Sequence, residues 1–268
     1  MESREKEVKN IFKISKIIIS ELSANHITSL KIMLHALCSY FFRISAIPVK
    51  LRLVLCGKLH DIKVRTLSDY FTIYEIFIAK QYEALYTGKG IIFDIGSHIG
   101  LSTIFFENSY NPSKMYCFEP LPENISLFRQ NTGKYYDNIR FFPLALYSYD
   151  GEVPLYYDRK RSNAGSVFRK DKKNAVVVRC KTIDSIIENE QISEIDIFKF
   201  DIEGAEFELF KNFGSKDIVN IFIGEIHADK KNGFEADEFK KHFKNYSCRL
   251  KRMGGEKYLF FAERTDHK

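Results

Sequence analysis

Residues 91–100 form a pattern typical of a buried strand that runs through a glycine turn into a helix. Apolar side chains fill four of the first five positions, as expected for a strand covered on both faces. Gly96 and Gly100 follow, where the backbone must bend and let a ligand approach closely. Leu101 and Phe105 then recur at helical spacing, so a helix N-terminus faces the turn. The stretch therefore predicts a nucleotide-type cofactor site in a doubly wound, Rossmann-like α/β sheet.

The next predicted strand indicates which cofactor binds. Residues 115–118 are apolar and end at Glu119-Pro120, and Glu119 follows Asp94 by 25 positions. An acid about 20 residues beyond such a turn meets the hydroxyls of a ribose. The turn lacks the three glycines that bind a pyrophosphate, and the Asp94 carboxylate would repel a pyrophosphate but attract an ammonium or sulfonium group. These features favour S-adenosylmethionine over a dinucleotide.

Three carboxylates lie close together after the predicted strand 195–200. Asp201, Glu203 and Glu206 fall within six residues, and they cannot all be buried without a partner cation. Because the carboxyl ends of parallel strands border the ligand crevice, we expect Asp201 and Glu203 near the reacting atoms. We expect Glu206 to stabilise the N-terminus of the following helix. An acid-rich cap without chemistry is the alternative.

A second polar group ends the predicted strand 219–226, where Glu225 and His227 flank an isoleucine. A histidine with a pKa near neutrality suits general base catalysis, and a structural hydrogen bond is the alternative role. Asp201, Glu225 and His227 also have the oxygen and imidazole atoms that hold a divalent cation. The sequence does not choose between a base and a metal site.

The pattern divides the chain into an N-terminal helical and β extension, residues 1–88, and a cofactor-binding domain, residues 89–268. In the extension we predict helices over 5–22 and 28–42, a hairpin over 49–55 and 61–66, and a helix capped by Ser68-Asp69. In the domain we predict strands at 91–95, 115–118, 139–142, 195–200 and 219–226, helices at 99–108, 122–131, 182–190, 204–213 and 235–244, and a final antiparallel pair at 247–253 and 257–263. Residues 147–181 break this alternation as an insertion with strands at 152–157 and 175–179.

Positive charge is placed unevenly along the chain. The net charge is +6, and the excess lies within residues 1–90. A second basic run, Arg159 to Lys173, is either a solvated loop or a surface for an anionic acceptor or membrane. The apolar run from Ile32 to Phe42 is far shorter than the roughly 20 residues that span a bilayer, so residues 1–45 either cap the core or contact a membrane peripherally.

Cysteine usage and the N-terminus indicate a cytoplasmic protein. The five cysteines are scattered, odd in number and without a Cys-x-x-Cys pair, which predicts reduced thiols and argues against an iron–sulfur centre. The first ten residues are strongly charged, unlike a signal peptide.

Several motifs occur in an order that resembles one known family. They are Asp94-Ile-Gly-Ser-His-Ile-Gly100, Phe118-Glu-Pro120, Leu144-Ala-Leu146 before Asp150-Gly-Glu152, and Lys199-Phe-Asp-Ile-Glu-Gly-Ala-Glu206. Together they resemble the FkbM-type family of S-adenosylmethionine-dependent methyltransferases over about residues 60–265. Asn163-Ala-Gly-Ser166 and Arg179-Cys-Lys-Thr-Ile-Asp184 are also similar to that family.

The resemblance implies a seven-stranded class I methyltransferase sheet over residues 89–268 and O-methylation of a hydroxyl on a sugar, glycan precursor or secondary metabolite. For the cofactor it implies Asp94, Gly96, Ser97, His98 and Gly100 at the methionine side, Glu119 and Pro120 at the ribose, Leu144 and Ala145 at the adenine, and Asp201 beside the reacting centre. The residues expected to meet the acceptor are Arg159, Asn163, Ser166 and Glu203, and those expected at the reacting centre are Asp201, Glu225 and His227.

Three other functions stay open. A nicotinamide-dependent oxidoreductase would share the sheet but need a three-glycine turn, and a nucleic-acid methyltransferase of the adenine-amino type would need an Asn/Asp-Pro-Pro-aromatic loop. A binding module that has lost its cofactor would not be expected to keep Asp94, Gly96, Gly100 and Glu119. The basic insertion points to a phosphorylated or nucleotide-linked sugar as acceptor.

Overall fold

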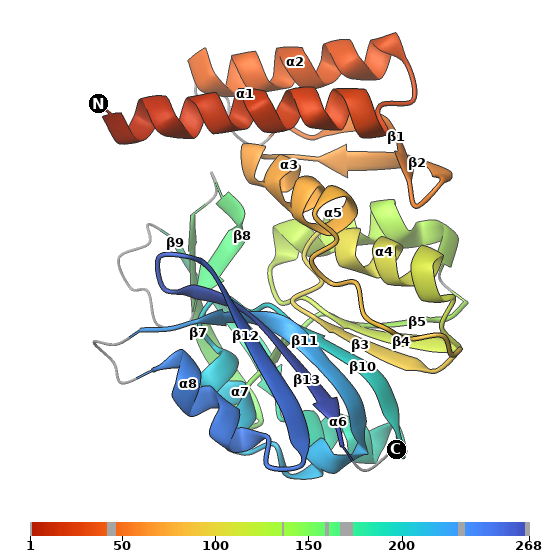
Figure 1. Ribbon diagram of the computed structural model, residues 1–268, viewed down its shortest axis with the longest axis vertical. Helices are drawn as coiled ribbons and strands as arrows, with labels where there is room; N and C mark the ends of the chain where they lie inside the picture. Colours follow the sequence, from red (N-terminus) through yellow and green to blue (C-terminus); the bar gives the residue numbers. More distant parts are fainter. Residues whose placement is uncertain are drawn as a thin grey trace.

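A seven-stranded sheet forms the centre of the protein (Figure 1). The computed structural model describes residues 2–41, 47–135, 137–158, 161–166, 174–229 and 234–265. The strand order is β12-β13-β11-β10-β3-β4-β5; β13 runs antiparallel to both β12 and β11, and the other neighbouring strands are parallel. The strands are β3 (Ile91–Ile95), β4 (Lys114–Phe118), β5 (Ile139–Phe142), β10 (Ile195–Phe200), β11 (Val219–His227), β12 (Tyr246–Gly254) and β13 (Lys257–Arg264). The predicted doubly wound sheet is confirmed, and β3 and β10 flank its topological switch point.

Helices cover both faces of the sheet, and the side chains of each strand alternate between them. On one face Ile92, Met115 and Ile197 pack beneath α4 (Leu101–Tyr110) and α5 (Pro122–Thr132), followed by η2 (Gly133–Tyr135). On the other face Phe93 and Phe198 belong to an aromatic-rich core. That core lies against α6 (Ile183–Asn189), α7 (Glu206–Lys211), η3 (Gly214–Ile218), α8 (Ala236–Phe239) and η5 (Lys240–His242).

Two predicted helices are shorter than expected. The helix predicted over 204–213 begins only at Glu206, because Glu203 and Gly204 adopt φ angles of +54° and +106°, outside the helical region. The helix predicted over 235–244 ends at Phe239 and continues as the 3₁₀ turn η5.

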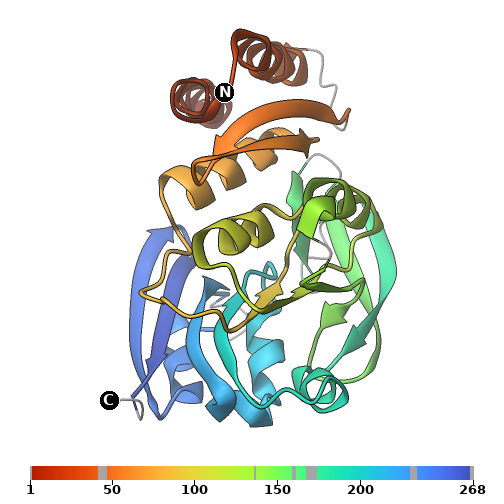
Figure 2. The ribbon, with the colours of Figure 1, turned by 90° about the vertical axis from the view of Figure 1, so that its right-hand side faces the viewer.

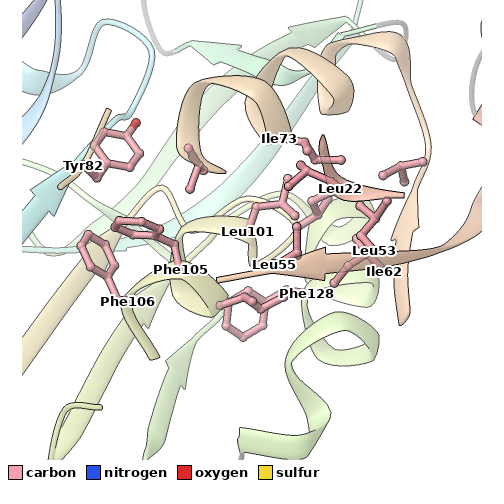
Figure 3. Packing of buried hydrophobic residues seen from close by; sticks show 14 of the residues in the cluster. Leu22, Leu53, Leu55, Ile62, Ile73, Tyr82, Leu101, Phe105, Phe106 and Phe128 are labelled. Atoms are coloured by element: carbon pink, nitrogen blue, oxygen red, sulfur yellow. The ribbon is translucent and has the colours of Figure 1, made fainter. Parts of the chain in front are cut away.

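The N-terminal part forms a separate layer of helices and a hairpin that packs onto the helices covering one face of the sheet (Figure 2). Its elements are α1 (Glu2–Leu22), α2 (His26–Phe41), β1 (Val49–Leu55), β2 (Lys58–Val64), α3 (Leu67–Ile73) and the π-helical turn η1 (Tyr74–Ile78). Leu22, Leu53 and Ile73 share one buried cluster with Leu101 and Phe128 of the sheet's covering helices (Figure 3). The extension is thus joined to the domain by a continuous apolar core.

The start of α3 differs from the prediction. Its N-cap is Thr66, two residues before the expected Ser68-Asp69. Asp69 occupies the third helical position and its Oδ2 accepts hydrogen bonds from the backbone N–H groups of Arg65 (2.6 Å) and Thr66 (2.8 Å). This is the capping-box arrangement, in which the acid acts from inside the first turn.

The insertion is a small four-stranded sheet with the order β6-β9-β7-β8. Its strands are β6 (Ala145–Leu146), β7 (Gly151–Asp158), β8 (Arg161–Ser166), of which only the backbone is described, and β9 (Asn174–Lys181). The strands predicted at 152–157 and 175–179 are therefore confirmed. Within the part of the chain described, no helix combines the length and the apolar character needed to cross a bilayer.

Candidate active site

Both glycines of the turn after β3 are required by the backbone. Gly96 has φ +73°, and a Cβ built on it would lie 1.9 Å from the carbonyl oxygen of Asp201. Gly100, the N-cap of α4, has φ +89°, and its Cβ would lie 2.5 Å from the Thr132 side chain. Side chains at these positions would strain the backbone and collide with neighbouring groups. The first glycine therefore lets the turns after β3 and β10 approach each other.

Asp94 and Lys199 form a buried ion pair behind this turn. Asp94 Oδ1 lies 3.0 Å from Lys199 Nζ, and Asp94 Oδ2 accepts hydrogen bonds of 2.7 Å from both Ser102 and Thr103. Lys199 also donates to the carbonyl oxygen of Gly96 at 2.7 Å. The pair fixes the turn from inside the protein. Lys199, but not Asp94, lines the cavity described below.

Glu119 lies at the carboxyl end of β4 with three hydrogen bonds. Its Oε2 accepts from the backbone N–H of His98 at 3.0 Å. Its Oε1 accepts from the backbone N–H of Leu121 at 2.9 Å and from the Asn124 amide at 3.2 Å. Burial raises the pKa of Glu119 to about 7, although these donors oppose the rise. The donors fix the carboxylate at the edge of the cavity.

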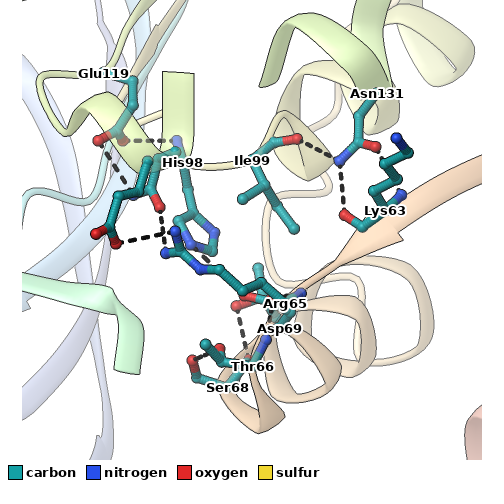
Figure 4. A network of polar contacts seen from close by, with 12 residues as sticks. Lys63, Arg65, Thr66, Ser68, Asp69, His98, Ile99, Glu119 and Asn131 are labelled. Carbon is teal, nitrogen blue, oxygen red and sulfur yellow. Dashed lines mark hydrogen bonds and ion pairs between the residues drawn. The ribbon is translucent and has the colours of Figure 1, made fainter. Parts of the chain in front are cut away.

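A polar network from the N-terminal part supports these cofactor-side residues (Figure 4). Arg65 donates to Glu123 and to Asn124 Oδ1, each at 3.1 Å, and Asn124 in turn donates to Glu119. Asp69 Oδ1 lies 3.7 Å from His98 Nε2. Burial lowers the pKa of His98, and Asp69 opposes this only in part. The predicted turn residue His98 and the predicted ribose ligand Glu119 are thus both positioned by the segment before and within α3.

A cavity opens at the carboxyl ends of β3, β4 and β10, with about 1040 Å³ of empty space including its open mouth. This volume suits a small-molecule cofactor together with part of an acceptor. Of the predicted site residues, those lining it are Gly96, Ser97, His98, Glu119, Pro120, Leu144, Ala145, Asp201 and Glu203. The described lining residues therefore bring most of the predicted cofactor residues together with Asp201 of the predicted reacting centre, whereas Glu225 and His227, like Asp94 and Gly100, are not part of the lining.

The wall opposite the sheet comes from the N-terminal part and includes Thr72, Glu75, Ile76, Gln81 and Tyr82. The Tyr82 hydroxyl donates to Asp201 Oδ2 at 3.0 Å. The Gln81 amide donates to Glu225 Oε1. Sequence reasoning missed these residues, because the spacing of aromatic residues before Tyr82 is that of an ordinary buried helix face.

The three reacting-centre residues converge as predicted. Asp201, Glu225 and His227 each offer a ligand-type atom, and these atoms lie within 4.8 Å of one another. His227 Nδ1 is 3.0 Å from Glu206 Oε1, and its Nε2 is 3.6 Å from Glu225 Oε2 and 3.9 Å from Glu203 Oε2. Glu206 also accepts from the backbone N–H of Gly204 at 3.0 Å. Glu206 therefore binds both the loop before its helix and the histidine.

The charge state of His227 differs from the expectation of a pKa near neutrality. Burial alone would lower the pKa of His227, but the carboxylates of Glu206, Glu203 and Asp201 raise it to about 10. At neutral pH the ring is an imidazolium ion, which has no lone pair to accept a proton. The sequence could not reveal this, because the shift depends on how α7 packs Glu206 against the end of β11.

The pKa values of Asp201 and Glu225 are shifted in opposite directions. Burial would raise the pKa of Asp201, but Lys199, Lys257 and His227 hold it below its ordinary value. Burial and the charge of Asp201 raise the pKa of Glu225 to about 7. Asp201 is therefore the ionised acid of the cavity wall. Its Oδ1 has no hydrogen-bond partner among the described residues.

The same group fits a divalent cation poorly. Lys257 Nζ already forms an ion pair with Glu225 Oε2, and Gln81 donates to the other oxygen of that carboxylate. A metal would have to displace the lysine and remove a proton from His227. Among the described residues, Lys257 and the charged His227 therefore balance the carboxylates that a metal would otherwise bind.

The predicted acceptor residues of the insertion are only partly described. Arg159 lies outside the described residues, and for Asn163 and Ser166 only the backbone of β8 is described. Their roles stay predictions. Glu203 is described and lines the cavity in the left-handed conformation.

A sequence model of the methyltransferase FkbM domain matches residues 94–250, more than half of the chain. The chain belongs to the FkbM methyltransferase family. The match spans the glycine turn, Glu119 and the cluster at Asp201 and His227. Because the chain belongs to this family, it is an S-adenosylmethionine-dependent methyltransferase and not a nicotinamide-dependent oxidoreductase.

Two relatives and one solved structure are similar to this FkbM methyltransferase. Methyltransferase 1 of Beauveria bassiana is 22% identical over 202 residues, covering 66% of this chain and 81% of that protein. The hexuronic acid methyltransferase AglP of Haloferax volcanii is 22% identical over 139 residues, covering 52% of this chain and 56% of that protein. The crystal structure of methyltransferase FkbM from Methylobacillus flagellatus KT is 12% identical in sequence, with a TM-score of 0.48. The alignment covers 96% of this chain and only 60% of the solved chain.

Proposed function

We propose that this FkbM methyltransferase transfers a methyl group to a hydroxyl of a sugar or sugar-containing precursor. The observation that carries the proposal is the ionised Asp201 at the cavity wall, whose Oδ1 has no partner among the described residues. A carboxylate in this state can accept a hydrogen bond from an uncharged hydroxyl acceptor. The relative named a hexuronic acid methyltransferase supports a sugar as the carrier of that hydroxyl.

In this proposal the cofactor lies along the carboxyl ends of β3 and β4. Glu119 accepts hydrogen bonds from the ribose hydroxyls, since three donors already orient its carboxyl oxygens at the edge of the cavity. Leu144 and Ala145 contact the adenine, and the turn at Gly96 and Ser97 faces the methionine part. Bound S-adenosylmethionine supplies a methyl group activated by its sulfonium.

The chain's own contribution is to align the acceptor and remove a proton. The cavity wall would hold the acceptor oxygen in line with the methyl group that the bound cofactor supplies, and Asp201 Oδ1 would take the proton that the hydroxyl loses. Alignment of two reactants supplies about 7–11 kcal/mol and a positioned base about 10²–10⁴-fold. Tyr82 holds Asp201 through Oδ2, which leaves the buried Oδ1 without a hydrogen-bond donor among the described residues.

His227 then acts through its charge instead of as a base. Together with Lys199 and Lys257, the imidazolium keeps Asp201 ionised in a buried site. Glu203 and the insertion would complete acceptor recognition, with the basic run suited to a phosphorylated or nucleotide-linked sugar.

Methyl transfer to a panel of free, uronic-acid, phosphorylated and nucleotide-linked sugars tests the proposal. The product's methyl group should be located by NMR on an oxygen. The proposal predicts O-methylation of at least one sugar, and a rate about 10²–10⁴-fold lower with Asp201→Asn, which keeps the shape of the side chain but lacks its charge. Methylation of a nitrogen, or full activity of the variant, would overturn it. Chelation of divalent cations should leave the rate unchanged.

A further inference from the structure

The outer face of α2 is apolar and faces solvent. The opposite face of the helix packs toward α1 and β1 through buried residues such as Ile32 and Ala36. The exposed fractions of the outer side chains are 68% for Ile27, 56% for Leu30, 52% for Met33 and 49% for Leu34. Their spacing of three and four places them on one stripe. Four of the eleven exposed large hydrophobic side chains among the described residues therefore lie on this single helix.

The part of the chain that carries this stripe also carries the positive charge. Residues 1–90 hold 14 Lys and Arg against 8 Asp and Glu, whereas the rest of the chain has 27 of each. On the described side chains of α1 and α2, Lys13, Lys16 and Lys31 are exposed and Glu21 is the single acid. Lys31 follows Leu30 on α2, and Lys13 and Lys16 lie on α1, which packs against α2.

The two helices form one end of the molecule, beyond the hairpin of β1 and β2 (Figures 1 and 2). At this end α2 can meet a flat surface without obstruction by the sheet or the insertion. A helix that presents an apolar stripe and nearby lysines to solvent has the pattern of one that lies in the plane of a membrane interface.

We propose that the outer face of α2 docks onto a bilayer containing anionic lipids, with Ile27, Leu30 and Leu34 entering the acyl boundary and the lysines contacting the head groups. The positive charge of these helices favours an anionic bilayer over a second copy of the chain as the binding partner of this face. A symmetric pairing of the same face would bring its lysines together, whereas anionic lipids complement them. The proposal does not depend on which acceptor is methylated.

The test uses vesicles of phosphatidylcholine with and without phosphatidylglycerol, and the full chain. The chain contains no tryptophan, so Leu30→Trp introduces a unique fluorescent reporter. Its emission should shift to the blue on anionic vesicles and less so at high salt, because screening weakens the contribution of the lysines. The control is Leu85→Trp, at a position 98% exposed outside α2, which should not shift.

A triple variant, Ile27→Gln, Leu30→Gln and Leu34→Gln, should bind anionic vesicles roughly a hundredfold more weakly in sedimentation, since three apolar side chains no longer enter the bilayer. Its thermal unfolding should match that of the wild type, because all three side chains are exposed. Unchanged vesicle binding by this variant, or equal binding of the wild type to neutral vesicles, would overturn the proposal. So would a wild-type dimer that the variant converts to monomer while neither binds vesicles.

Discussion

Two regions line the same cavity, and they are built in different ways. At the carboxyl edge of the sheet, short loops after β3, β4 and β10 place Gly96, Glu119 and Asp201 by local backbone geometry. Across the cavity, Tyr82 lies four residues after the end of η1, in a segment that the N-terminal hairpin and helices hold in place. The comparison indicates that the extension reaches the cofactor side only indirectly, through Arg65 and Asn124, whereas on the reacting side its Tyr82 contacts Asp201 directly.

The largest effect expected on the sheet side is that of Lys199→Met. Removing the buried ammonium leaves Asp94 uncompensated, so the free energy of unfolding should fall by about 3–5 kcal/mol in urea titrations. The matched control is Lys114→Met on β4 of the same sheet, a lysine that is exposed and whose loss should change stability by less than about 0.5 kcal/mol. A loss for Lys199→Met as small as that of the control would show that the pair does not stabilise the turn.

Asp201→Asn is the next largest expected change and separates chemistry from binding. The rate of methyl transfer should fall by about 10²–10⁴-fold, because the acceptor's proton has no base. Binding of S-adenosylhomocysteine, followed by calorimetry, should stay within a few-fold. Comparable losses in both measurements would place Asp201 in cofactor binding instead.

Arg65→Met tests whether the extension reaches into the cofactor side. The variant loses the donors to Asn124 and Glu123, so Glu119 is less well positioned and cofactor affinity should fall by about tenfold, the effect of one hydrogen bond to a charged group. Arg52→Met is the control, since Arg52 pairs with Asp61 on the exposed face of the hairpin. Equal cofactor affinity in the two variants would show that Arg65 does not contribute to cofactor binding and that the residues at the edge of the sheet suffice.

A smaller effect is expected in the pH dependence of stability. Because the pKa of His227 rises from 6.5 to about 10 on folding, its contribution is complete below pH 6.5 and is lost as the pH rises to about 10. The wild type should therefore lose more stability than His227→Gln between pH 7 and 10 in thermal denaturation. Parallel curves for the two proteins would mean that the histidine is not charged in the native state.

Much of the sheet was predictable because buried parallel strands are marked by continuous apolar runs. The structure gives β3, β5 and β10 the bounds predicted for them. The start of α7 was misplaced because the sequence does not show that Glu203 adopts a positive φ angle. Such conformations are set by the close approach of neighbouring loops.

The site was predictable where a residue follows its strand directly, and not where its role depends on distant contacts. Glu119 and Asp201 were found from their positions after β4 and β10. Tyr82 was not found, because 119 residues separate it from Asp201 in the chain. The charge of His227 was wrong for the same reason, since Glu206 on another element sets it.

The most direct test of the division between the two regions is calorimetric titration of S-adenosylhomocysteine into Glu119→Gln and Tyr82→Phe, beside the wild type. We expect Glu119→Gln to weaken binding about tenfold or more, because an amide NH₂ would replace one of the two oxygens that accept hydrogen bonds at this position. We expect Tyr82→Phe to bind like the wild type while its methyl transfer slows about tenfold, because Asp201 loses one donor. Wild-type affinity in Glu119→Gln, or an equal loss of affinity in both variants, would contradict the different roles of the two regions.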